Sequence, residues 1–272
     1  MHCAEATKTY DGSHRAGNEG ACDTLPAVTE ISYEASPVPV REDLTASQRR
    51  AWKRLAEPGA WWTGAERVAI AAEARNARSC RLCRERQTAL SASAISGEHE
   101  GLGSLSGAAV DSIHRITTDH GRLSKVWFEQ NRAAGIEAGP YVEIVGIVTT
   151  VVSIDSFCRG LGLPPHPLPT PVAGEPSRYR PAGATTGNAW VPTITFLRAR
   201  GAEADLYDGR PTGNVMTALS LVPDEVRTLK DLSATHYLSP EKMIDLGAGR
   251  SLDRAQMELI AARVSVLNEC FY

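Results

Sequence analysis

The sequence predicts an all-α fold, and three observations lead to this prediction. Apolar residues recur at helical spacing along most of the chain. Capping residues precede several of these segments, and no set of alternating strands is found. The chain has 272 residues, of which 42% are hydrophobic and 22% charged, so it is long enough to bury a sizeable core. We therefore expect a globular helical protein.

Composition excludes several classes of function. A net charge of −3 and an aromatic content of 6% give no sign of a nucleic-acid-binding surface. No apolar stretch follows a basic start, so no secretory signal is predicted. The most apolar run, Val142 to Ile154, is too short to span a bilayer. We expect a soluble cytoplasmic protein that binds neither nucleic acid nor membrane.

The chain divides into four segments. Residues 1–45 show no sustained period and predict a flexible extension. Residues 46–162 predict a first helical half. Residues 163–195 contain eight prolines and predict a connection without regular structure. Residues 196–272 predict a second helical half.

In the first half, Thr63-Gly-Ala-Glu66 is a capping box that opens a helix reaching about Leu90. Two further helices are predicted at 107–118 and 122–133. Pro140 opens a long apolar helix that ends at Gly160-Leu-Gly162.

In the second half, helical signals cover 213–222, 223–233 and 239–246. Ser251 and Asp253 then offer caps for a final helix that reaches Tyr272.

Six cysteines are too few for a disulfide scaffold, but two of them form the motif Cys80-Arg-Leu-Cys83. Two intervening residues let the thiols meet at a helix turn. Nearby arginines favour the thiolate, which is the nucleophilic form; they are Arg75, Arg78, Arg81 and Arg84. Inert thiols and half of a zinc site are alternatives, although no second close Cys or His pair follows in the sequence.

Residues 63–83 match residues 253–272 when the chain is shifted by 190 positions. Ile70-Ala-Ala then falls on Ile260-Ala-Ala, and Cys80 falls on Cys270. Thr63 falls on Asp253, each at a predicted helix N-cap. This match predicts an internal repeat in which a helix delivers a cysteine near its C-terminal end.

The second copy reads Glu258-Leu-Ile-Ala and then Val264-Ser-x-Leu-Asn268-x-Cys270-x-Tyr272. This pattern resembles the catalytic helix of the alkylhydroperoxidase D-like (AhpD-like) superfamily, which is related to carboxymuconolactone decarboxylases. The stretch from Asn214 to Pro223 resembles the helix that precedes the motif. Residues 75–83 resemble a degenerate first copy.

The resemblance implies an all-α fold with two related halves, a homo-oligomer and a thiol peroxidase. In such an enzyme the distal cysteine attacks a hydroperoxide, the proximal cysteine forms a disulfide, and a Glu and a His relay protons. A thioredoxin-like protein or a small thiol supplies electrons, and no cofactor or metal is expected. Glu258 occupies the family's glutamate position and Cys270 the proximal, resolving position.

The sequence departs from the family pattern in both copies. Tyr272 stands one residue before the attacking position, and we expect residue 273 to be a selenocysteine encoded by UGA, which leaves the second site catalytically incomplete as it stands. The first copy has Gln87 where the family has His. We interpret Glu66 as a helix-capping residue and Glu73 as a surface charge. Cys80 and Cys83 are therefore predicted to lack the Glu and His that relay protons in the family.

Other polar residues have simpler interpretations. His114 and His120 do not share a helix face, so a joint metal site is not expected. Glu143 lies within the apolar helix and needs a partner, such as Arg159 or a histidine. Asp155 and Arg159 are spaced as an i,i+4 ion pair.

The sequence leaves three hypotheses about function. The first is a hydroperoxide-reducing oxidoreductase that uses a Cys-x-x-Cys or Cys-x-x-selenocysteine pair. The second is a non-catalytic redox switch or protein-binding module that uses Cys80 and Cys83. The third is a decarboxylase-like enzyme on the same fold. No phosphate-binding loop, nucleophile elbow or His-Glu-x-x-His motif supports another enzyme class.

Overall fold

The computed structural model describes residues 31–268 and Cys270. Helices dominate this part of the chain, which contains no strand and a single isolated bridge between Thr185 and Thr193. The prediction of an all-α fold is therefore confirmed.

Ten α-helices lie within the described residues. They are α1 (Glu42–Ala56), α2 (Gly64–Asn76), α3 (Arg81–Thr88), α4 (Gly107–Thr118), α5 (Lys125–Ala133), α6 (Ala138–Gly160), α7 (Asn214–Thr217), α8 (Pro223–His236), α9 (Pro240–Met243) and α10 (Arg254–Leu267).

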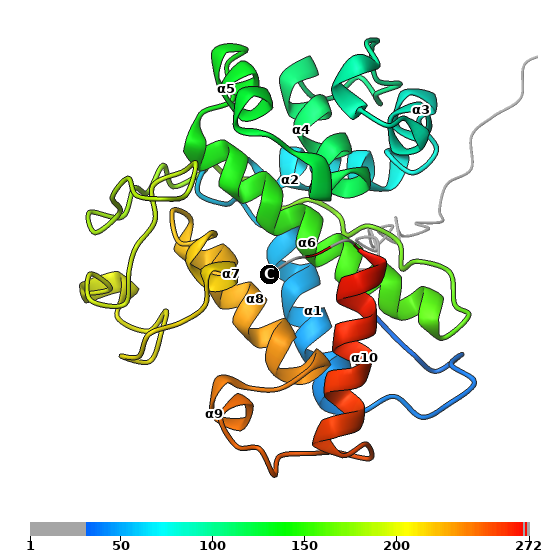
Figure 1. The fold of residues 1–272 in the computed structure, drawn as a ribbon, viewed down its shortest axis with the longest axis vertical. Helices are drawn as coiled ribbons and strands as arrows, with labels where there is room; N and C mark the ends of the chain where they lie inside the picture. Colours follow the sequence, from blue (N-terminus) through cyan, green and yellow to red (C-terminus); the bar gives the residue numbers. More distant parts are fainter. Residues whose placement is uncertain (1–30, 269, 271–272) are drawn as a thin grey trace, which may run out of the picture.

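Helix α6 is the centre of the fold. It packs against α2, α4 and α8, and its apolar side chains, such as Ile144 and Ile154, are fully buried. In Figure 1, α2 to α5 lie on one side of α6, and α1, α8 and α10 lie on the other. Helix α6 is long and apolar enough to cross a membrane, but 67% of its apolar window is buried within the fold, as in the core helix of a soluble protein.

The predicted helix from Thr63 to about Leu90 is divided in two. Its capping box is confirmed, since the Thr63 hydroxyl accepts from the Glu66 N–H and Glu66 accepts from the Thr63 N–H. The helix stops at Asn76, where the Ser79 hydroxyl donates to the Asn76 carbonyl oxygen at 2.9 Å. Such local side-chain bonds compete with helix continuation. A new helix, α3, then begins with Cys80 as its N-cap.

Residues 31–45 are ordered against the helices rather than flexible. Ile31 and Tyr33 are buried against the core, and α1 begins at Glu42, so the prediction of a flexible segment up to residue 45 is wrong for this part. Residues 1–30 lie outside the described residues.

The buried carboxylates of α6 have other partners than the sequence predicts. Glu143 pairs with Arg67 of α2, which also contacts Glu225 of α8 at 3.1 Å. Asp155 pairs with Arg75 at 2.7 Å rather than with Arg159. Both partners are distant in sequence, and only the packing of α2 on α6 brings them together.

The Pro-rich connection follows the surface of the helices without regular structure, as predicted. The Val172 N–H donates to the Ala56 carbonyl oxygen at 2.8 Å, and the Ser177 N–H donates to that of Gly59 at 3.0 Å. These bonds attach the connection to the end of α1 and the turn after it.

The two copies of the proposed repeat begin alike but differ in burial. Asp253 and Gln256 form a capping box at the start of α10, as Thr63 and Glu66 do at the start of α2. Ile70 in α2 is 0% exposed, whereas Ile260 at the matching position of α10 is 53% exposed. Helix α10 lies on the surface, and none of its described side chains is buried.

Candidate functional site

Cys80 and Cys83 lie together at the start of α3. Cys80 is the N-cap residue, and Cys83 lies within the first turn of the helix. Each residue is 1% exposed, and both thiols are free. They belong to a small buried cluster with Leu82, on which the side chain of Ile95 also packs.

Two histidines face these sulfurs. His99 comes from the loop between α3 and α4, and its Nδ1 lies 3.6 Å from Cys80 Sγ and 3.4 Å from Cys83 Sγ. His114 comes from α4, and its Nδ1 lies 3.3 Å from Cys83 Sγ. The two rings pack edge to face with centroids 4.4 Å apart.

A carboxylate lies behind each imidazole; that of Glu73 is buried, and that of Asp111 is partly exposed. Glu73 Oε1 is 2.7 Å from His114 Nε2, and Asp111 Oδ1 is 3.0 Å from His99 Nε2. The Leu102 N–H donates to Glu73 at 2.9 Å, and the Trp127 indole N–H donates to Asp111 at 2.6 Å. Two chains of carboxylate, imidazole and thiol therefore meet at Cys83.

These contacts favour the thiolate of Cys83. Burial opposes its ionisation, but His114, His99 and Thr118 outweigh burial and lower the pKa of Cys83 to about 6. The pKa of Cys80 is lowered less, because burial is opposed mainly by the backbone N–H groups of Cys83 and Glu100.

The imidazoles are correspondingly easier to protonate. Burial disfavours the imidazolium form of His99, but Asp111 and the two thiols outweigh this effect and raise its pKa to about 10. The pKa of His114 is also raised, since Cys83 and Glu73 outweigh the effect of burial. These shifts favour a Cys83 thiolate beside a protonated His99 at neutral pH.

The geometry contradicts one interpretation in the sequence analysis and weakens one of its arguments. Glu73 is a buried partner of His114 rather than a surface charge, so Cys80 and Cys83 have carboxylate–imidazole pairs beside them. The absence of a second close Cys or His pair in the sequence did not exclude a metal site, because His99 and His114 reach the thiols from separate elements.

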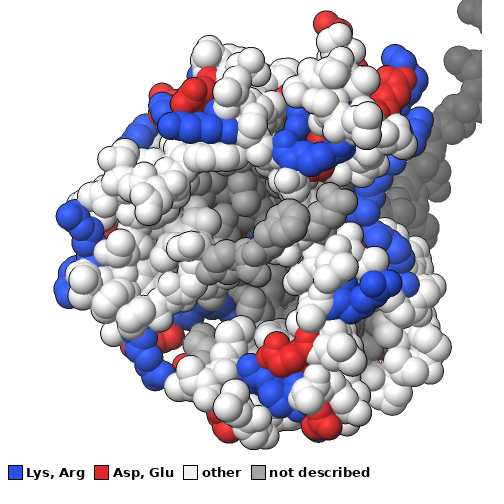
Figure 2. All heavy atoms as spheres, in the orientation of Figure 1, with Lys and Arg blue, Asp and Glu red and all other residues white. Residues whose placement is uncertain are grey.

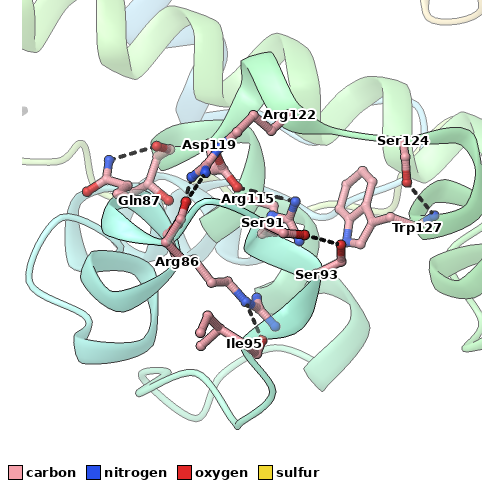
Figure 3. Close-up of polar contacts among 12 residues, drawn as sticks. Arg86, Gln87, Ser91, Ser93, Ile95, Arg115, Asp119, Arg122, Ser124 and Trp127 are labelled. Carbon is pink, nitrogen blue, oxygen red and sulfur yellow. Dashed lines mark hydrogen bonds and ion pairs between the residues drawn. The ribbon is translucent and has the colours of Figure 1, made fainter.

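A cavity of about 910 Å³ lies next to this cluster. Arg86 and Asp111 line it and also contact His99, at 3.0 Å each. Neither the two cysteines nor His99 line the cavity. Figure 3 shows its polar wall, where the Arg122 guanidinium lies against Asp119 and Ser91 lies against Ser93.

The surface carries charges of both signs. On the face shown in Figure 2, the basic and acidic side chains are interspersed rather than gathered into one patch. This distribution agrees with the small net charge of −3.

The residues of the second copy lie apart from this cluster. Glu258 is exposed and bonds to Tyr237 and to Arg254, the latter at 2.7 Å. Cys270 is exposed beyond the end of α10. About 14 Å of helix axis separates Glu258 from Leu267 at that end, at a rise of about 1.5 Å per residue.

The end of α10 lies near the ends of α3 and α4. Leu267 and Asn268 line a cavity of about 360 Å³ together with Gln87 of α3 and Thr118 of α4.

Comparison with protein families, with curated proteins and with solved structures gave no match.

Proposed function

We propose that this protein is a thiol-dependent peroxidase that reduces hydroperoxides through Cys83 and Cys80. The observation that carries this proposal is the position of Cys83, whose sulfur lies beside two imidazoles that are each backed by a carboxylate. A peroxidase needs a thiolate and a nearby acid in one site, and this arrangement holds both.

The reaction would take place in two steps. The Cys83 thiolate attacks the terminal oxygen of the hydroperoxide, the O–O bond breaks, and the leaving alkoxide takes a proton from an imidazolium, which leaves a sulfenic acid. The Cys80 thiol then attacks the Cys83 sulfur, water leaves, and a disulfide forms. A dithiol donor, such as a thioredoxin-like protein or a small thiol, reduces the disulfide.

Cys83 is the better attacking residue of the two. Its sulfur contacts both imidazoles, whereas Cys80 contacts only His99. Cys80 has the position of the resolving thiol, since the resemblance to the AhpD-like superfamily places the resolving cysteine first in the motif.

The substrate must pass the loop that carries His99. Both thiols are buried, and the nearby cavity is lined by Arg86 and Asp111, whose side chains contact His99. A movement of the 95–106 loop would join the cavity to the thiols. We assign this cavity as the place where the hydroperoxide binds first.

The burial of both sulfurs also favours a second candidate function, a redox switch that is oxidised once and not turned over. The two functions differ in turnover. A peroxidase consumes many equivalents of peroxide when a dithiol is present, whereas a switch consumes one.

The test measures consumption of cumene hydroperoxide by the reduced, metal-free chain in the presence of dithiothreitol. We expect repeated turnover by the wild type and by C158S, whose thiol is buried elsewhere in the core. C83S should lose activity. C80S, treated with peroxide in the absence of dithiothreitol, should consume one equivalent and hold a sulfenic acid that reacts with dimedone. Wild-type consumption no faster than that of C80S/C83S would overturn the proposal.

A further inference from the structure

Four metal-ligand side chains converge in the buried cluster. The sulfurs of Cys80 and Cys83 and one nitrogen each of His99 and His114 all lie within 4.8 Å of one another. The three sulfur–nitrogen contacts measure 3.3, 3.4 and 3.6 Å. A tetrahedral zinc ion, with Zn–S of about 2.3 Å and Zn–N of about 2.0–2.1 Å, places its sulfur and nitrogen ligands about 3.5 Å apart. The three sulfur–nitrogen contacts thus have the length expected for edges of a zinc tetrahedron.

Hydrogen bonds alone explain this arrangement incompletely. The Nδ1 atom of His99 faces two sulfurs at once, at 3.6 and 3.4 Å. One N–H group can point directly at only one acceptor. A cation at the centre of the cluster would contact all four ligand atoms.

The outer contacts of the histidines are those of metal ligands. Each ring directs Nδ1 to the sulfurs and places Nε2 against a carboxylate, Glu73 for His114 and Asp111 for His99. Metal-bound histidines usually hold such a carboxylate or carbonyl partner on the second nitrogen, which fixes the ring and its tautomer.

The donor set identifies the class of metal. Two thiolates and two imidazoles suit Zn²⁺, whereas Mg²⁺ and Ca²⁺ require oxygen ligands. All four positions of a tetrahedron would be filled by protein atoms, which is typical of a closed rather than a catalytic zinc site.

We propose that the reduced protein binds one Zn²⁺ ion through Cys80, Cys83, His99 and His114, and that the bound ion protects the two thiols from oxidation. The second part rests on the proposed function. The thiolates bound to zinc are not free to attack, so peroxide reacts when the metal has left or is being displaced. Oxidation then balances as zinc dithiolate plus hydroperoxide plus two protons, which give disulfide, alcohol, water and free Zn²⁺.

The first experiment measures metal binding without peroxide. The reduced full chain is titrated anaerobically with Co²⁺ and then with Zn²⁺ in competition with a chromogenic chelator. We expect one equivalent of Co²⁺ with tetrahedral d–d bands and thiolate charge-transfer absorption, displaced by one equivalent of Zn²⁺. The disulfide form of the same chain should not bind.

Variants locate the site. H99Q lies on a loop and should weaken Zn²⁺ binding at least tenfold, and D111N should weaken it by about 10- to 100-fold through the His99 ring. The controls H120Q and C158S should bind as the wild type does. Absence of a tetrahedral Co²⁺ spectrum, or equal affinity in H99Q and H120Q, would overturn the proposal.

A second experiment separates this inference from the proposed function. Peroxide oxidation of the thiols is compared in zinc-loaded and chelator-stripped protein, and we expect it to be at least tenfold slower with zinc. If the stripped protein reduces peroxide but binds no zinc, the zinc proposal is overturned and the peroxidase proposal stands. If zinc binds but the stripped protein does not react with peroxide, the zinc site stands and the peroxidase proposal fails. Equal oxidation rates with and without bound zinc would overturn the protective role.

Discussion

The sulfur of Cys83 lies 3.3 Å from Nδ1 of His114, a residue 31 positions further along the chain. The other nitrogen of the same ring lies 2.7 Å from Glu73 on α2. Three helices thus contribute one buried side chain each to a single chain of polar contacts. Such an arrangement can move protons at a thiol, and it can hold a metal ion. The peroxidase proposal rests on the first property and the zinc proposal on the second.

Glu73 acts through His114, and its charge should set the reactivity of Cys83. E73Q keeps the size of the side chain but removes the negative charge that favours the His114 imidazolium. We expect the pKa of Cys83, now about 6, to rise, and the rate of peroxide oxidation to fall about tenfold or more. The measurement is the pH profile of Cys83 alkylation by iodoacetamide in the metal-free protein. An unchanged profile would contradict this role for Glu73.

Arg67 should be essential to stability, because it is the ion-pair partner of two buried carboxyl groups, those of Glu143 and Glu225. R67M leaves both carboxylates buried and should lower the free energy of unfolding by about 3–5 kcal/mol. The variant R67M/E143Q/E225Q removes the stranded charges as well and should recover much of the loss. Urea denaturation measures all three proteins, and a loss below about 1 kcal/mol in R67M would count against this account.

Gly146 allows α6 and α8 to approach closely. A Cβ atom at this position would lie 2.4 Å from an oxygen of Glu225 and 2.7 Å from its Cβ. We expect G146A to cost about 1–3 kcal/mol of unfolding free energy through overpacking. Gly160 at the end of the same helix is the matched control, since its added Cβ would meet no atom within 4 Å. G160A should be neutral or stabilising by up to about 1 kcal/mol.

The two copies of the repeat should respond differently to the same substitution. Ile70 is fully buried between helices, so I70A should cost about 2–5 kcal/mol. Ile260 is mostly exposed, so I260A should change the free energy of unfolding by less than about 0.5 kcal/mol. Thermal and urea unfolding of the two variants compares them directly. A large loss in I260A would show that the exposed face of α10 is covered in solution.

His166 should make stability depend on pH. Its ring packs against Tyr33, its Nε2 has no hydrogen-bond partner, and its pKa is lowered, by burial above all. In the unfolded chain its pKa is about 6.5. The pKa of His166 is lower in the folded than in the unfolded protein, so protonation of this residue favours unfolding. The contribution of the neutral His166 ring to the free energy of unfolding is therefore fully present above about pH 6.5 and is lost as the pH falls.

The variant H166F keeps a ring against Tyr33 and removes the titrating group. Its free energy of unfolding should fall less than that of the wild type between about pH 7.5 and 5.5. H120Q changes an exposed histidine and should keep the wild-type slope. Parallel slopes for wild type and H166F would exclude His166 as the cause.

The helices that the sequence predicted well are those with local signals. The capping boxes at Thr63 and Asp253 are formed, and the helix that includes Pro140 ends at Gly160. The break after Asn76 was missed because the Ala-rich stretch has high helix propensity throughout, and side-chain bonds to the backbone decide its end.

The candidate site was predicted only in part. The motif Cys80-x-x-Cys83 is visible in the sequence because its two thiols are close along the chain. His99 stands in a loop without a period and gave no signal, and His114 looked like one more polar residue of a helix. Their approach to the thiols depends on the packing of α4 against α2 and α3, which is a long-range property of the fold.

The most direct test of the central claim maps the bond that peroxide creates. The reduced, metal-free chain is treated with one equivalent of hydroperoxide, alkylated, digested and analysed by mass spectrometry. We expect a single new disulfide between Cys80 and Cys83, with Cys158 still alkylated after unfolding. Oxidation of Cys270 or Cys158 while Cys80 and Cys83 stay reduced would contradict the claim.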